Sequence, residues 1–310
     1  MLKGMKAKRQ LAAFVALAVG GAFAGMPAAQ AAESTDKNEH VVQTGYKING
    51  ADGTLSKPYG NISGTALIEK NPTTKNKLTI TSGNVGGSSL VPIVIGNVSA
   101  GGPETKDEAV TGNTLVLNSV LLQGNAYGGI GTNNLQESGA NGNSVVLDGD
   151  VVRVDGIVAG SRSTGGGASR GTVDLKNGTV HGTVAGGYGK SIANDNHVNI
   201  TGGMVDGTVY GGYAEEPRAN TTGNYVSIDD AGDANKTYTA DLTRAALSGG
   251  NQAGYGENHL EVRTKGITAR AAQNFNFYDF YLDTGIQRDD TLLTLTDGDA
   301  LGRAVSIGQV

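Results

Sequence analysis

One phrase recurs along the chain and constrains its fold more than any other feature. The clearest copy, NHVNITGGMVDGTVYGGY, runs from Asn196 to Tyr213. An Asn opens an apolar-x-apolar segment, a Gly-rich turn follows, and a second such segment ends in two glycines. Self-similarity at a nearly constant period predicts one supersecondary unit stacked on copies of itself.

Seven copies align on the first position of this phrase, with spacings of 37, 30, 28, 25, 28 and 34 residues. The strand-like segments keep their length, whereas the Gly-, Ser- and Asn-rich connections vary. Insertions that collect between strands of constant length are typical of a stack of coils. The first position falls at Asn76, Asn113, Asn143, Gly171, Asn196, Asn224 and Asn258.

The pattern predicts an all-β chain folded as a parallel β-solenoid, also called a β-helix, because each turn would pair with the turns above and below it. Gly suits the sharp corners, and Asn can hydrogen-bond to its own copy in the next turn. Disorder is the alternative, but Gly and Pro together, 56 of 310 residues, are too few for a low-complexity chain. Alternation predicts that Val198, Ile200, Val205 and Val209 face inward. It also predicts outward positions for His197, Asn199, Asp206 and Thr208.

The N-terminus has the three parts of a secretory signal peptide: a basic start, an apolar Leu11–Phe23 stretch and the small-x-small sequence Ala29-Gln30-Ala31. We therefore expect a signal helix over residues 1–31 and a mature chain that starts at Ala32. Residues 32–75 are weakly patterned and are predicted to form an N-terminal cap or irregular segment. Residues 76–262 are the predicted solenoid, and residues 263–310 a C-terminal β segment.

The C-terminal segment contains the aromatic run NFNFYDFYL, residues 274–282. Aromatic residues on both faces of one strand indicate that both faces are buried. Such a strand needs neighbours on each side, and few residues follow it. The sequence therefore predicts that the chain is an N-terminal fragment, or that a partner supplies the missing layer.

Composition excludes several classes of partner and chemistry. Without the four basic residues of the signal, 20 Lys and Arg stand against 29 Asp and Glu, a net charge of −9. Such a chain should not bind nucleic acid. Cysteine is absent, which excludes disulfides and thiolate metal sites. No catalytic motif stands in a fitting strand–helix context. We therefore expect no enzymatic activity, no cofactor and no metal.

The repeat register nevertheless aligns two columns of candidate ligand-binding residues. Asp155, His181 and Asp206 share one repeat position, and successive turns would place them about 4.8 Å apart. This column could hold a divalent cation or a sugar, the alternative being a solvated sheet face. Tyr188 and Tyr213 follow the double glycine and form either an aromatic platform for a sugar or a cover for the solenoid edge.

Signal peptide, Gly- and Asn-rich β repeat and aromatic run together resemble the passenger region of bacterial autotransporters. The likeness is greatest to large passengers of the NxVxI…GGxVxGxVYGGY type, and residues 249–282 look like a block that follows the repeats in that group. The resemblance covers residues 1–31 and about 76–300. It implies export to the cell surface, outer membrane or extracellular space, with an outer-membrane translocator barrel downstream. Residues 1–310 lack the series of about 10-residue alternating strands of such a barrel, which favours the fragment interpretation.

Two classes of function follow from these features. The first is a non-enzymatic passenger that acts in adhesion, aggregation or surface display, with a host or bacterial surface ligand such as a glycan as its partner. The second is a β-helix carbohydrate-active enzyme, a lyase or glycosidase. A glycosidase needs two carboxylates roughly 5–9.5 Å apart, and Asp155 and Asp206 lie two predicted turns apart.

Overall fold

The computed structural model describes residues 39–67, 74–102, 109–132, 139–229, 240–251, 256–282, 284–297 and 306–307. The predicted signal peptide, residues 1–31, lies outside these ranges. Apart from the short helix α2 (Gly64–Leu67), the regular structure in these ranges is β-strand. No helix among the described residues is long and apolar enough to span a membrane.

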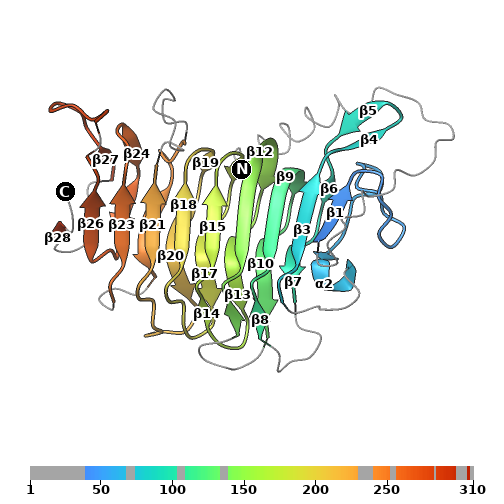
Figure 1. The fold of residues 1–310 in the computed structure, drawn as a ribbon, viewed down its shortest axis with the longest axis horizontal. Coiled ribbons are helices and arrows are strands. Elements are labelled where there is room, and N and C mark those ends of the chain that lie inside the picture. Colours follow the sequence, from blue (N-terminus) through green and yellow to red (C-terminus); the bar gives the residue numbers. More distant parts are fainter. Residues whose placement is uncertain are drawn as a thin grey trace, which may run out of the picture.

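Successive turns of the chain lay their strands side by side in long parallel sheets (Figure 1). The largest sheet, here the main sheet, has 13 strands, all paired in parallel. Equivalent repeat positions lie opposite each other, as Val173, Val198 and Val226 do. In spatial order its principal strands are β1 (Glu39–Gln43), β3 (Lys77–Thr81), β9 (Thr114–Leu122), β12 (Ser144–Val154), β15 (Thr172–Leu175), β18 (His197–Ile200), β21 (Tyr225–Ile228), β23 (His259–Val262), β26 (Phe277–Phe280) and β28 (Ser306–Ile307).

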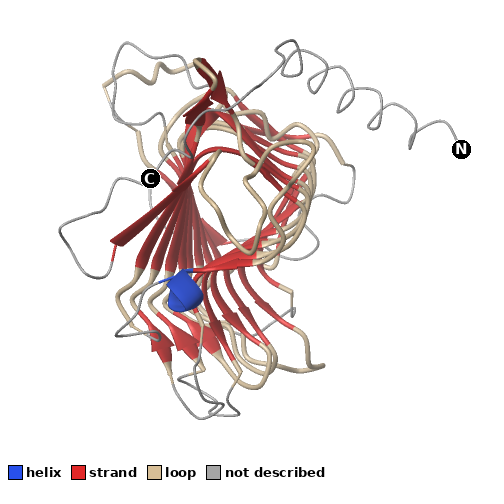
Figure 2. Ribbon diagram, turned by 90° about the vertical axis from the view of Figure 1, so that its right-hand side faces the viewer, coloured by secondary structure: helices blue, strands red, loops and turns tan. Residues whose placement is uncertain are grey.

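Two further parallel sheets, one of eight strands and one of three, run alongside the main sheet. The view along the stack shows successive turns nearly superimposed (Figure 2). The second sheet contains β2 (Ile62–Ser63), β7 (Val98–Gly101), β10 (Ala126–Gly131), β13 (Val158–Ser163), β17 (Val184–Gly189), β20 (Thr208–Ala214), β22 (Ala246–Gly250) and β25 (Ala271–Gln273). The third contains β8 (Val110–Thr111), β11 (Ala140–Asn141) and β14 (Ala168–Ser169). The chain thus has the solenoid-like, parallel β fold that the repeat predicts.

The remaining strands pair at the corners and ends of the stack. Short strands β6 (Ile93–Val94), β16 (Thr179–Val180) and β19 (Met204–Val205) join the main sheet beyond a bend, and β24 (Ile267–Ala269) pairs with β27 (Leu293–Leu295). One hairpin, β4 (Gly83–Val85) with β5 (Ser88–Leu90), is antiparallel. Its loop residues Gly86 and Gly87 have φ of 61° and 82°, which suits a tight two-residue hairpin turn. The range 76–262 is therefore not purely parallel.

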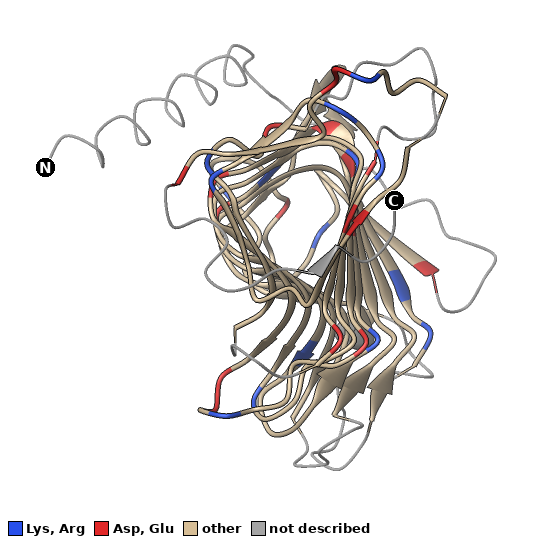
Figure 3. Cartoon of the chain, turned by 90° about the vertical axis from the view of Figure 1, so that its left-hand side faces the viewer, with Lys and Arg blue, Asp and Glu red and all other residues tan. Residues whose placement is uncertain are grey.

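The interior is a column of branched apolar side chains that runs the length of the stack. Val198, Ile200, Val205 and Val209 are all 0 % exposed, which confirms the inward positions expected from alternation. The outward neighbours His197, Asn199, Asp206 and Thr208 are partly or fully exposed. Among the described buried residues Asp279 alone carries a charge. Acidic and basic residues are spread over strands, corners and loops, with both signs interspersed (Figure 3).

A ladder of buried asparagines runs beside this core at the start of the main-sheet strands. The side-chain Nδ2 of Asn196 donates to Asn224 Oδ1 at 3.0 Å, and that of Asn224 to Asn258 Oδ1 at 3.1 Å. Each Oδ1 also accepts the backbone N–H of the preceding ladder residue. The ladder thereby satisfies buried polar groups at the corner where the main sheet begins.

The left-handed backbone conformation lies one residue before the ladder, not at the asparagines themselves. Lys75, Arg170 and Asp195 have φ of 57°, 50° and 56°, and Gly112, Gly142 and Gly223 occupy the same position in other turns with φ between 62° and 68°. A residue with φ > 0 turns the chain into the strand. The asparagine that follows is free to direct its amide along the stack.

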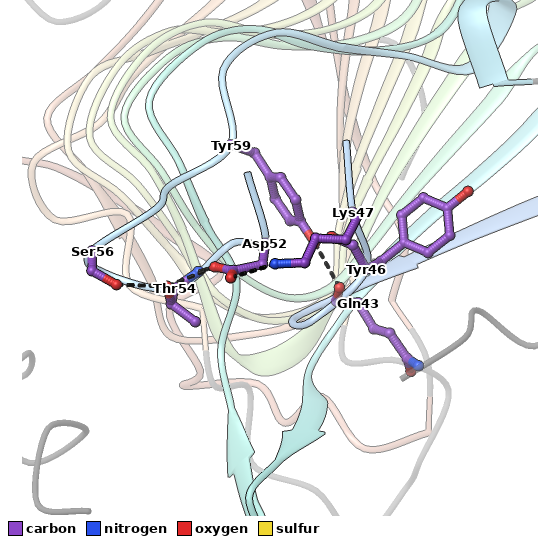
Figure 4. A network of polar contacts seen from close by, with 7 residues as sticks. All are labelled: Gln43, Tyr46, Lys47, Asp52, Thr54, Ser56 and Tyr59. Carbon is purple, nitrogen blue, oxygen red and sulfur yellow. Dashed lines mark hydrogen bonds and ion pairs between the residues drawn. The ribbon is translucent and has the colours of Figure 1, made fainter. Parts of the chain in front are cut away.

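The N-terminal end of the core is closed by residues 43–60 (Figure 4). Tyr59 is 0 % exposed, and its hydroxyl donates to the backbone carbonyl groups of Gln43 at 2.8 Å and Tyr46 at 2.7 Å. Lys47 and Thr54 both bond to the carboxylate of Asp52 beside it. Because β1 also pairs with β3, the parallel ladder reaches into the range predicted as a cap. At the other end it continues through β26 and β28, beyond residue 262.

Candidate functional site

A column of four stacked rings lies on the outer face of the main sheet, here called the aromatic column: His197, Tyr225, His259 and Phe277. These residues take the first outward position of β18, β21, β23 and β26 and lie opposite one another in register. Successive ring centroids are 4.7, 4.6 and 4.7 Å apart, with interplanar angles of 26°, 9° and 25°. The spacing is that of neighbouring strands, so parallel pairing alone brings the rings into stacking distance.

Polar side chains form a second row beside this column, two residues further along the same strands. Glu261 Oε2 accepts hydrogen bonds from Ser227 Oγ at 2.6 Å and from Arg263 at 3.1 Å. Burial raises the pKa of Glu261, but these hydrogen bonds and the charge of Arg263 outweigh it and leave that pKa lowered. Glu261 is therefore held as a carboxylate.

A buried hydrogen bond anchors the C-terminal end of the column. The Asp279 side chain is 6 % exposed, and its Oδ2 lies 2.6 Å from His259 Nδ1. The carboxylate can only accept, so Nδ1 of His259 donates the proton. This bond fixes the ring plane of His259 between Tyr225 and Phe277 and explains how a charged side chain is retained at a buried position.

Burial also acts on the titration of the first two rings. Burial lowers the pKa of His197, although the negative charges of Glu261 and Asp195 act to raise it. It raises the pKa of Tyr225, and the charges of Glu261 and Asp279 add to that increase. At neutral pH both rings are therefore uncharged, which favours face-to-face contact without charge repulsion.

The predicted column of Asp155, His181 and Asp206 lies on one face of neighbouring turns, as the pairing of Val154 with Val180 and of Val180 with Val205 requires. The polar side chains of this column pair with one another or with arginines, whereas the sequence predicted that they bind a cation or a sugar. His181 Nδ1 lies 2.6 Å from Asp206 Oδ2, and Asp155 Oδ1 is 2.7 Å from Arg153 Nε. A second cation, Arg244, lies 3.6 Å from Asp206 Oδ1. No group of three or more His, Asp or Glu that could hold a metal ion occurs among the described residues.

The predicted pair Tyr188 and Tyr213 stacks on the outer face of the second sheet, with ring centroids 4.5 Å apart and an angle of 29°. The facing sides of these rings are therefore covered by each other. Arg162 covers another face of Tyr188, with its guanidinium carbon 4.4 Å from the ring centroid. Tyr210 packs edge-on against Tyr213 at 5.0 Å. A sugar ring that stacks on an open aromatic face has little of Tyr188 left to contact.

Sequence reasoning did not identify the aromatic column. The repeat register places His197 and His259 two turns apart, with Tyr225 in the turn between them. The signal was present: the residue after the ladder asparagine is His, Tyr, His and Phe in four successive strands. The last member was hidden because the alignment ended at Asn258, whereas Asn276 continues the ladder by accepting the Asn258 backbone N–H.

Comparison with known proteins adds no family to these observations. No family model, no curated protein and no solved structure matches the chain.

Proposed function

We propose that the protein is an exported, non-enzymatic passenger of the autotransporter type, acting at the cell surface in adhesion, aggregation or display. The observation that carries the proposal is the outer face of the main sheet. Four strands in succession present stacked rings and hydrogen-bonded polar side chains on one regular surface. A long, ordered face of this kind suits repeated contact with a partner surface.

The charged groups support contact rather than reaction. In a glycosidase one carboxyl group must be free to donate a proton and a second must face the substrate. Here Asp155 is bound by Arg153, Asp206 by His181, and Glu261 by Ser227 and Arg263. The lowered pKa of Glu261 keeps it ionised, which is the wrong protonation state for a general acid. The β-helix carbohydrate-active enzyme is therefore the second candidate.

One experiment separates the two candidates and tests export. The full chain is expressed in a Gram-negative host, and the exported protein is purified and its N-terminus sequenced. We expect a start at Ala32, saturable binding to bacterial or epithelial cell layers, and no reducing ends released from a panel of polysaccharides. Release of reducing ends or unsaturated products would favour the enzyme. The proposal would be contradicted if the protein stayed in the cytoplasm with residues 1–31 still attached. It would also be contradicted if the exported protein bound none of the cell layers.

A further inference from the structure

The first ring of the aromatic column has one face without a neighbouring ring. His197 stacks on Tyr225 on one side, but on the other side its partner in register is Thr172. Thr172 is small and half-buried, and His197 is exposed. Two residues along the same strand, the carboxylate of Asp174 accepts a hydrogen bond from Asn199 Nδ2 through Oδ1 at 2.7 Å. An open ring face therefore lies close to a carboxylate.

Elsewhere in the chain, a ring face that lies close to a carboxylate is covered by an arginine of the chain itself. Arg263 lies opposite Tyr281 on the next turn, as the bond from Tyr281 N to the Val262 carbonyl shows. Its guanidinium carbon is 3.8 Å from the Tyr281 ring centroid, and its Nη2 is 3.1 Å from Glu261, two residues earlier on the same strand. One guanidinium thus contacts a ring on the next strand and a carboxylate on its own strand.

A second arginine on another sheet follows the same plan. Arg162 lies opposite Tyr188 in register and stacks on it at 4.4 Å. Its Nη2 is 2.8 Å from Glu215. In both cases a planar cation covers a ring face one strand away and pairs with a carboxylate. Where β15 pairs with β18, the ring of His197 and the carboxylate of Asp174 are present, but the residue opposite the ring is Thr172.

We propose that the open face of His197, together with Asp174, binds an arginine side chain of a partner polypeptide. The small Thr172 leaves room for the guanidinium, which would stack on His197 and hydrogen-bond to Asp174. The ring is neutral at neutral pH because burial lowers the His197 pKa, so it does not repel a cation. This inference deepens the proposed function by naming the chemistry of the partner.

The cationic residues that flank β15 in the sequence are Arg170 and Lys176. Lys176 is held by Asp148, with Nζ 3.2 Å from Oδ2. Arg170 lies two residues before Thr172, in the left-handed turn that leads into β15.

The first test installs the arginine in the chain. Thr172→Arg places a guanidinium opposite the His197 ring, with Asp174 two residues further along the same strand, so its melting temperature should exceed that of a matched control by about 2 °C. The control is Thr172→Gln, which puts a long polar side chain at the same place but carries no charge. Adding Asp174→Asn, which can still accept the Asn199 bond, should remove the gain. Equal melting temperatures for Thr172→Arg and Thr172→Gln would overturn the proposal.

The second test adds the arginine from outside. N-acetyl-arginine amide is titrated into the full exported protein while the His197 ring protons are followed by NMR. We expect saturable shifts, affinity at least about threefold higher than for N-acetyl-lysine amide, and loss of the shifts in Thr172→Arg and in Asp174→Asn. Equal affinities, or shifts that persist in both variants, would overturn the proposal. If Thr172→Arg still binds cell layers normally, the proposed function stands and this inference fails.

Discussion

Ser161 Oγ accepts hydrogen bonds from both the backbone N and the side-chain Nδ2 of Asn143, at 3.3 and 3.2 Å. In the other turns that place belongs to a ladder asparagine, but here the ladder residue is Gly171. Ser161 in turn occupies the position of Gly129 and Gly187, where an added Cβ would come within 2.6 and 2.3 Å of the ladder asparagine. One turn has therefore exchanged an Asn–Gly pair for a Gly–Ser pair.

This exchange predicts strong coupling between positions 161 and 171. Ser161→Gly leaves two donors of buried Asn143 without their acceptor, which costs about 1–3 kcal/mol of unfolding free energy. Gly171→Asn brings a Cβ within 2.1 Å of the Gly186 carbonyl and is destabilising as well. The double variant restores the pair used elsewhere. A double-mutant cycle from urea unfolding should show at least about 1 kcal/mol of favourable coupling, and additive effects would contradict the exchange.

A charge in the core column should be far more harmful than one on the sheet face. Val198→Asp places a carboxylate without a partner where the side chain is 0 % exposed, and we expect a loss above about 3 kcal/mol. Asn199→Asp on the next residue is the control: it loses the bond to Asp174 and faces that carboxylate, but water reaches the position, so its loss should be the smaller one. Thermal melts followed by circular dichroism would measure both. If Val198→Asp melts no earlier than Asn199→Asp, the assignment of Val198 to the core and of Asn199 to the outer face is wrong.

The aromatic column should stabilise the stack through ring contact rather than through the Tyr225 hydroxyl. Tyr225→Ser removes two stacked contacts, with His197 at 4.7 Å and His259 at 4.6 Å. We expect a loss of about 1–3 kcal/mol from this variant, whereas Tyr225→Phe keeps the rings and should stay near wild type. Urea midpoints of the three proteins decide the matter. Equal losses from Ser and Phe would assign the effect to the hydroxyl.

The buried face of His197 should make stability depend on pH. Burial lowers its folded-state pKa from the ordinary value of 6.5, so near that pH the unfolded chain binds a proton that the folded chain does not. The free energy of unfolding therefore rises with pH in this range. The stabilising contribution of neutral His197 is lost progressively as the pH falls below about 6.5. His40, whose pKa burial also lowers, acts in the same direction.

His197→Phe keeps the stack on Tyr225 and removes this titration. Melting temperatures measured from pH 8 to pH 5.5 should fall less steeply for His197→Phe than for the wild type. Tyr225→Phe is the control, because it changes the same column but keeps His197, so its melting temperature should follow the wild-type dependence on pH. Curves that run parallel for wild type and His197→Phe would show that His197 does not titrate in this range.

The repeat in the sequence by itself determined the register of the stack. The spacing of the ladder positions and the alternation within each strand were enough to predict that four residues are buried: Val198, Ile200, Val205 and Val209. In a strand, alternate residues point to the same face, so a pairing that buries one of these apolar residues also buries the others on that face. The same register predicted that Asp155, His181 and Asp206 share a face, since it depends only on which strands are neighbours.

Tertiary structure decided which partner each outward side chain takes. Register places several candidates within reach, and local competition selects among them: Asp155 pairs with Arg153 rather than with His181, and Asp206 takes His181. The aromatic column joins residues from four turns, each of which contributes one ring to it. Its open end exists only because Thr172 happens to lie opposite His197, a relation that depends on the pairing of β15 with β18 and not on either strand alone.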